Sequence, residues 1–179
     1  EWGAYLGEEG VRNGIKTRVS RWKRFPSASF PNAKATGTYI NSILAKQEAV
    51  EGGYDEALML NGEGFISEGS GENLFLVRGG EVLTPPLSAG CLDGITRATV
   101  MTILTDQGIA VAERDVIQQE LYEADELFLT GTAAEVTPIR QVDGHEIGDP
   151  GPITRLAQER YASTVTGKVP EYQGWLDYV

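Results

Sequence analysis

Polar and apolar positions alternate in several short runs of this sequence, which indicates a protein rich in β-strands. Residues 14–22 (GIKTRVSRW) alternate in this way, and residues 56–60 (EALML) form an apolar run of the length of a buried strand. Residues 65–86 predict two strands joined by a glycine-rich kink, then a short third strand after a Gly-Gly turn. Further strands are expected at residues 109–115, 125–131 and 136–144.

Helical periodicity separates these strands. Residues 38–53 carry apolar side chains at helical spacing, among them Tyr39, Ile43 and Ala49, and end in two glycines. Hairpins dominate the middle of the chain, so the interleaved elements favour a mixed, barrel-like α/β sheet over a purely parallel, doubly wound one. A chain of 179 residues fits one domain, residues 1–179. Further helices are expected at residues 94–108, 118–124 and 152–165.

Composition narrows the classes of function. The net charge of −11 argues against nucleic acid or an anionic membrane as the main partner. Cys91 and His145 are the only residues of their types in the sequence, so an internal disulfide is impossible, and we expect neither a zinc site nor a Ser-His-Asp triad. No apolar run approaches the ~18–20 residues of a membrane span, and no signal peptide is visible. We therefore expect a cytoplasmic protein without a metal site.

A single lysine lies among small residues between a loop and a helix. Lys34 is flanked by Ala33 and Ala35, with Gly37 and Tyr39 shortly after it, so another molecule could approach its amine closely. An amine is nucleophilic only when neutral, although its free pKa is ~10.4. A carbonyl partner that forms a Schiff base is the usual solution. An ordinary exposed loop lysine is the alternative interpretation.

A glycine-rich kink holds two carboxylates within residues 66–75 (ISEGSGENLF). Glu68 continues the pattern of the preceding strand and is expected to face the interior, whereas Glu72 follows the glycines. A buried glutamate needs a cationic partner, and no basic residue lies nearby in the sequence. A solvated bulge is the alternative interpretation.

Two segments offer backbone N–H groups to an anion. Gly94, Ile95 and Thr96 stand at the start of the helix 94–108, where free N–H groups and a hydroxyl form an anion site. An ordinary N-cap explains the same residues. Small residues at 131–134 follow a buried strand and leave further N–H groups accessible.

The candidate groups are thus one lysine, one rigid carboxylate, one tyrosine and two backbone anion sites. Pyridoxal phosphate needs this set of groups: an amine for its aldehyde, a carboxylate for its ring nitrogen, a hydroxyl for its phenolic oxygen and a helix N-terminus for its phosphate. We therefore expect this cofactor.

The stretch EGSGENLF…VLTPPLSAGCLDGITR resembles the signature of the class IV, fold-type IV pyridoxal-phosphate aminotransferases, and most closely of the branched-chain amino-acid aminotransferases. The segments WGAYL, AKATGTY, GTAAEVTP and GWLDYV extend the resemblance over nearly the whole chain. It implies the large cofactor-binding domain of the D-amino-acid-aminotransferase-like fold, and transamination of leucine, isoleucine and valine with 2-oxoglutarate. The matching motif positions are Glu68, Ser70, Asn73, Leu74, Phe75, Val82, Thr84, Leu92, Gly94, Ile95 and Arg97.

The resemblance also implies a role for each matching residue. Lys34 is the lysine that binds the cofactor covalently and moves the proton, Glu68 pairs with the ring nitrogen, and Tyr39 bonds the phenolic oxygen. The other cofactor contacts fall on Leu92, Ile95, Thr96 and Thr132, and the substrate contacts on Trp2, Tyr5, Thr132 and Ala133.

Two departures from the family pattern stand out. Asp93 occupies a position where proline is common in relatives, and we expect it to point outward. Family members also carry a small N-terminal domain before the WGAYL segment, with an arginine for the phosphate. The resemblance therefore implies that residues 1–179 are the large domain alone, inactive by itself.

Relatives form homodimers or assemblies of dimers that act on small amino and 2-oxo acids, and we expect the same partners here. Aminodeoxychorismate lyase and D-amino-acid transaminase share the fold and stay open as alternatives, as does an inert fragment.

Overall fold

The computed structural model describes residues 5–25 and 33–177 of the chain, so Trp2 lies outside the described residues. The strands are β1 Ile15–Val19, β2 Glu56–Leu60, β3 Ile66–Gly69, β4 Asn73–Arg78, β5 Glu81–Thr84, β6 Val111–Glu113, β7 Glu126–Gly131, β8 Glu135–Val142 and β9 His145–Glu146. The helices are α1 Glu8–Asn13, α2 Ile40–Glu51, α3 Ile95–Asp106, α4 Gln118–Tyr122 and α5 Pro152–Val165, with 3₁₀ turns η2 Thr36–Tyr39, η3 Leu87–Ala89 and η4 Pro170–Trp175.

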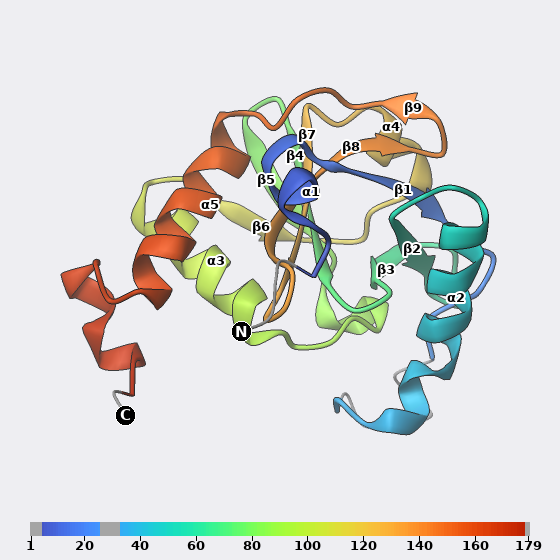
Figure 1. Cartoon of the computed structure of the whole chain (residues 1–179), viewed down its shortest axis with the longest axis horizontal. Coiled ribbons are helices and arrows are strands. Elements are labelled where there is room, and N and C mark those ends of the chain that lie inside the picture. Colours follow the sequence, from blue (N-terminus) through green and yellow to red (C-terminus); the bar gives the residue numbers. More distant parts are fainter. Residues whose placement is uncertain (1–4, 26–32, 178–179) are drawn as a thin grey trace.

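The strands of the described residues form one mixed sheet in the order β3-β2-β1-β8-β7-β4-β5-β6, with β9 paired to β8 (Figure 1). Parallel pairing joins β1 to β2, β1 to β8 and β5 to β6, and the remaining pairs are antiparallel. The predicted mixed, barrel-like sheet is therefore confirmed.

The sheet curls because of one short connection. Only residues 70–72 separate β3 from β4, yet four strands lie between them in the sheet order. The sheet must bend round to bring these two strand ends together, and the Gly69 N–H donates to the Glu72 carbonyl at 2.7 Å across the link. This link carries the glycine-rich kink that the sequence predicts, so the curl places the candidate carboxylates at a strand junction.

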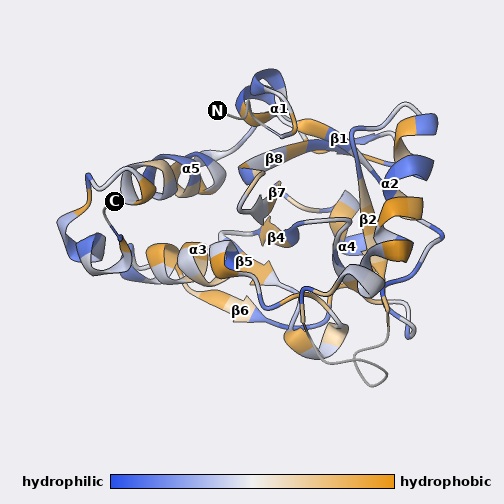
Figure 2. Cartoon of the chain, turned by 60° about the horizontal axis from the view of Figure 1, so that its bottom comes forward, coloured by the Kyte–Doolittle hydropathy of each residue, from blue (hydrophilic) through white to orange (hydrophobic). Residues whose placement is uncertain are grey.

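Apolar side chains fill both faces of the curled sheet. One cluster fills the inner face and includes Ile15, Leu58, Leu74 and Leu129. On the other face α3 and α5 lie side by side (Figure 2), and a second cluster packs their apolar residues on β4 and β7. There Phe75 stacks on Phe128 with ring centroids 4.9 Å apart. In the described part of the chain, none of the helices combines the length and apolar character that crossing a bilayer requires.

Small residues, and not the larger apolar ones, form the buried face of helix α2. Its buried residues are Ser42, Ala45 and Ala49, which lie against Ala57 and Met59 of β2 and beside Trp22 and Tyr54. The small side chains let the helix approach the strand closely, so the larger Ile43 is turned to solvent and 64% exposed. The helical spacing of Tyr39, Ile43 and Ala49 therefore predicts the helix but does not mark its buried face.

Candidate functional site

A cavity of about 280 Å³ lies where the β3–β4 link, the start of α3 and the β7–β8 turn meet. All seven residues that the sequence assigns to the cofactor line it: Lys34, Tyr39, Glu68, Leu92, Ile95, Thr96 and Thr132. Residues from four separate segments of the chain, 34–39, 68–73, 92–96 and 130–132, thus converge on one cavity. The remaining lining residues are Ser70, Gly71, Glu72, Asn73, Asp93, Gly94, Thr130 and Gly131.

Glu68 is one of two buried acids that line this cavity, the other being Glu72. Asn73 Nδ2 donates to Glu68 Oε2 at 3.2 Å, and the Leu92 N–H donates to the same oxygen at 2.9 Å. Arg24 Nε forms an ion pair with Glu68 Oε1. Burial raises the pKa of Glu68 to about 7, and the charge of Arg24 together with the Leu92 N–H keeps it from rising further.

Arg24 is a partner of the candidate site that the sequence did not reveal. It follows β1 and is itself buried. Besides Glu68, its Nη1 donates to the Thr38 carbonyl at 3.3 Å and to Ser42 Oγ at 3.4 Å. Arg24 therefore ties the acid of β3 to the 3₁₀ turn and helix that follow Lys34. Its distance from Glu68 in the sequence, with β2 between them, left no local signal for this pairing.

Asn73 donates a hydrogen bond to Oε2 of Glu68, the oxygen that does not pair with Arg24. Its Nδ2 also donates to the Leu92 carbonyl at 2.8 Å, so one amide joins the acid to the loop before α3. A Cβ on Gly94 would overlap Asn73 Oδ1, which explains why only glycine fits there. The motif residues Asn73 and Gly94 thus fix the position of the α3 N-terminus relative to Glu68.

The start of α3 presents free donors to the cavity. The helix has 12 residues, its N-cap is Gly94, and no side chain caps it. Its first N–H groups, those of Ile95 and Thr96 among them, therefore have no intrahelical acceptor, and they make a place for an anion. Thr96 is buried, whereas the Ile95 side chain is exposed. Asp93 is exposed at the rim of the cavity.

Lys34 and Tyr39 close the cavity on the side of η2. The Lys34 ammonium lies 5.9 Å from the centre of the Tyr39 ring, and the Arg24 guanidinium lies 5.7 Å from it. Lys34 is exposed and Tyr39 half-buried. The lysine is therefore within reach of both a ligand and solvent.

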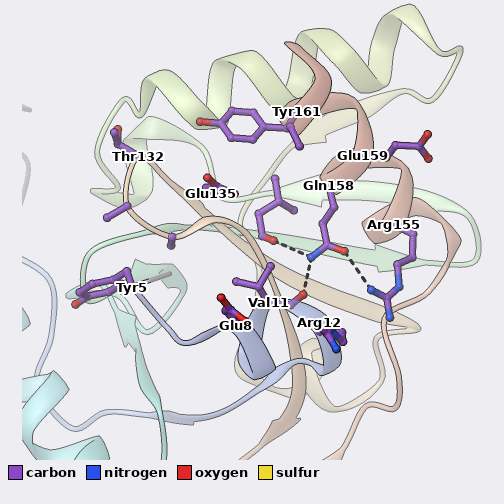
Figure 3. A pocket seen from close by; sticks show the side chains of 14 residues that line it. Tyr5, Glu8, Val11, Arg12, Thr132, Glu135, Arg155, Gln158, Glu159 and Tyr161 are labelled. Carbon is purple, nitrogen blue, oxygen red and sulfur yellow. Dashed lines mark hydrogen bonds between the residues drawn. The ribbon is translucent and has the colours of Figure 1, made fainter. Parts of the chain in front are cut away.

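A second, larger cavity of about 790 Å³ lies on the far side of the β7–β8 turn, between α1 and α5 (Figure 3). Tyr5, Thr132 and Ala133, three of the four residues that the sequence assigns to the substrate, line it. Gln158 fixes its floor by donating to the carbonyls of Val11 at 2.8 Å and Val136 at 3.0 Å. Thr132 lines both cavities, so the turn separates two adjoining spaces.

The residues of the smaller cavity fit a pyridoxal phosphate group. An accessible amine, a buried carboxyl and uncapped helix donors face one hollow. Thr130 is also among the lining residues, and its buried hydroxyl has no hydrogen-bond partner among the described residues. The described residues contain no group of three or more potential metal ligands.

Comparison with known proteins identifies the class of aminotransferases that the sequence motifs resemble. The model of the family "Amino-transferase class IV" matches residues 3–142. The chain belongs to this family of class IV aminotransferases.

The individual relatives are named as branched-chain aminotransferases, a narrower group than the family. The chain is 49% identical over 177 residues to a branched-chain-amino-acid aminotransferase of Pseudomonas aeruginosa, covering 97% of this chain and 57% of the relative. The crystal structure of the Escherichia coli branched-chain amino acid aminotransferase superposes with a TM-score of 0.95 at 44% identity, covering 99% of this chain and 59% of that one. The branched-chain aminotransferase of the archaeon Thermoproteus uzoniensis with norvaline gives 0.90 at 49% identity, with coverage of 93% and 56%. The chain thus spans less than two thirds of these relatives.

A further solved structure bears on the cofactor. It is a branched-chain amino acid aminotransferase with pyridoxamine 5'-phosphate, and it superposes on this chain with a TM-score of 0.93 at 50% identity. The match covers 99% of this chain and 59% of that one.

The ion pair between Arg24 and Glu68 allows a stability test. At pH 8 the Glu68 carboxyl is mostly ionised, so Arg24→Met leaves a buried charge without its cation and should lower the free energy of unfolding by about 3–5 kcal/mol. The control Arg21→Met breaks the pair with Glu48, in which the arginine is 76% exposed, and should cost less than about 1 kcal/mol. Urea denaturation measures both.

Adding Glu68→Gln to Arg24→Met should recover part of this loss, because the uncompensated charge is then gone. A double variant no more stable than Arg24→Met would contradict the pairing.

Proposed function

We propose that this chain is the cofactor-binding domain of an aminotransferase that uses pyridoxal phosphate and exchanges amino groups between leucine, isoleucine or valine and 2-oxoglutarate. The observation that carries the proposal is the convergence of Lys34, Glu68 and the α3 N-terminus on one small cavity. The printed names of the relatives supply the substrate class. In this proposal residues 1–179 form a single cofactor-binding domain, which is supported by the partial share of the relatives that the chain spans.

When bound, pyridoxal phosphate supplies a ring that accepts electrons from the substrate's α-carbon. In this proposal Lys34 would hold the cofactor through its aldehyde, and Lys34 Nζ would carry the substrate's α-proton. Glu68 would pair with the ring nitrogen as a carboxylate, whose negative charge would favour the protonated nitrogen. Tyr39 would donate its O–H to the phenolic oxygen.

The other roles follow the arrangement of the two cavities. Ile95 and Thr96 would hold the phosphate with their N–H groups, with Thr132 beside them and Leu92 against the ring. Thr132 is shared with the larger cavity, which has room for a branched side chain.

The substrate contacts are proposed on that side of the turn. Tyr5 would line the side-chain space, and the N–H groups of Thr132 and Ala133 would receive the substrate carboxylate. Trp2 is proposed as a further wall of the same space and lies outside the described residues.

A homodimer, or an assembly of dimers, in the cytoplasm completes the proposal. Exposed apolar side chains on α2 support association: Ile40 is 59% exposed, Ile43 64% and Val50 56%.

Covalent labelling tests the cofactor assignment. Pyridoxal phosphate followed by borohydride reduction should place a pyridoxyl group on Lys34, and peptide mass mapping locates it. Lys34→Arg keeps the charge but should remove the label. Labelling mainly at Lys16, Lys23, Lys46 or Lys168 would refute the assignment.

Turnover by the 179-residue chain alone is expected to be absent. Ile95 and Thr96 offer the phosphate only neutral donors, and charge-assisted contacts are about twice as strong as neutral ones. The assay uses leucine, 2-oxoglutarate and excess pyridoxal phosphate, with D-alanine and aminodeoxychorismate as alternative substrates. Leucine turnover near that of a full-length branched-chain enzyme would show that these residues suffice, and turnover of an alternative substrate instead would overturn the proposed specificity.

A further inference from the structure

Glu135 ends the turn between β7 and β8 with a backbone conformation that is unusual for a glutamate. Its φ angle is 52°, and it is one of two residues other than glycine that have a positive φ in the described part of the chain. A positive φ crowds the Cβ of an L residue against the backbone, which disfavours the conformation roughly 5- to 30-fold. The surrounding structure must therefore hold Glu135 in this conformation.

The other such residue, Asp143, has a local reason for its positive φ. Its φ is 50°, and Gly144 follows with a φ of 84°, as in the two-residue turns that join β-hairpins. Its carboxylate also accepts hydrogen bonds from the Val19 N–H at 3.0 Å and from the Tyr122 hydroxyl at 2.8 Å. Aspartate is moreover enriched at positive φ, whereas glutamate is not. The conformation of Glu135 needs a different explanation.

Contacts on both sides of Glu135 fix the shape of the turn. Glu135 pairs with Gly131 in the antiparallel register of β7 and β8, so residues 132–134 must reverse the chain. The buried Thr137 hydroxyl donates to the Ala134 carbonyl at 2.7 Å, and Ala134 is itself only 3% exposed. With Ala134 held in this way, the positive φ of Glu135 brings the chain back into register with β7.

The same shape leaves the first half of the turn open to both cavities. Thr132 and Ala133 are exposed, whereas Ala134 is buried. Thr132 lines the smaller and the larger cavity, and Ala133 and Glu135 line the larger one (Figure 3). Among the described residues, the N–H groups of Thr132 and Ala133 donate to no acceptor. These two groups are thus available to an anionic group where the cavities meet.

We propose that Glu135 is a positioning residue whose left-handed backbone, and not its charge, holds the N–H groups of Thr132 and Ala133 where they can donate to a ligand carboxylate. This inference deepens the proposed function and rests on it, because that function places the substrate carboxylate at these two groups. A negative φ at position 135 would break either the pairing with Gly131 or the bond from Thr137 to the Ala134 carbonyl. Either change would displace the two N–H groups.

Nuclear magnetic resonance of the chain without ligand tests the conformation. A positive φ brings a residue's own amide and α protons close together, so Glu135 should show a strong nuclear Overhauser effect between them. Glu135→Asn should keep this effect, because asparagine tolerates a positive φ, and Glu135→Val should lose it, because a β-branched residue does not. A weak effect at Glu135 in the unmodified chain would overturn the proposal, whether or not the chain binds pyridoxal phosphate.

A titration with 4-methylvalerate, a branched carboxylate, tests the role in binding. It should shift the amide signals of Thr132 and Ala133. Its affinity should stay within about threefold in Glu135→Gly, Glu135→Asn and Glu135→Gln, and should fall roughly tenfold or more in Glu135→Val. The control Glu81→Val makes the same change at the exposed first position of β5, where a β-branched residue suits a strand, and should leave the affinity unchanged.

A second variant acts on the turn without changing Glu135. Thr137→Val keeps the size of the side chain and removes the bond to the Ala134 carbonyl. It should weaken the Overhauser effect at Glu135 and lower the affinity for 4-methylvalerate about three- to tenfold. If Glu135→Val does not fold, this variant decides the question, and an unchanged affinity in Thr137→Val would overturn the proposal.

The variants separate the backbone of residue 135 from its side chain. An equal loss of affinity in Glu135→Gln and Glu135→Val would assign the effect to the carboxylate and overturn the proposal. An unchanged affinity in a folded Glu135→Val would overturn it too, as would no shift of Thr132 and Ala133 in the unmodified chain. Failure of Lys34 labelling with the expected shifts at Thr132 and Ala133 would instead count against the proposed function.

Discussion

The buried ion pair between Arg24 and Glu68 is the contact on which the site depends. Glu68 stands on β3, and Arg24 connects it to the Thr38 carbonyl and Ser42, so the segment that carries Lys34 and Tyr39 is held against the sheet. Asn73 and the Leu92 N–H fix the other oxygen of Glu68 and with it the approach to α3. One carboxyl thus connects the side of the cavity that carries Lys34 to the side formed by the start of α3.

Glu68 also shows how the fold produces a site whose buried acids have raised pKa values. The curl of the sheet closes through the three-residue link between β3 and β4, which buries Glu56, Glu68 and Glu72 near one another. Lys46 pairs with Glu56 and Arg24 with Glu68, and in the part of the chain that the structure describes no basic group forms an ion pair with Glu72. Burial therefore raises the pKa of both Glu68 and Glu72 toward or above neutrality, where a proton can be held or released.

Local patterns predicted most of the elements and most of the cavity. Strand β2 and helix α5 have the predicted bounds, since an uninterrupted apolar run and a proline-led amphipathic helix are strong local signals. The short α1 and β9 were missed because six and two residues are too few to show a period. The pairing of Arg24 with Glu68 was missed because it depends on the order of the strands in the sheet. The exposure of Ile43 was not predicted because it results from the close packing of α2 on β2.

A crystal structure of the chain grown with pyridoxal phosphate tests the central claim most directly. The account predicts cofactor density in the smaller cavity, continuous with Lys34 Nζ, with the ring nitrogen facing Glu68 and the phosphate at the start of α3. Cofactor density in the larger cavity, or joined to Lys46 beside Glu56, would contradict it.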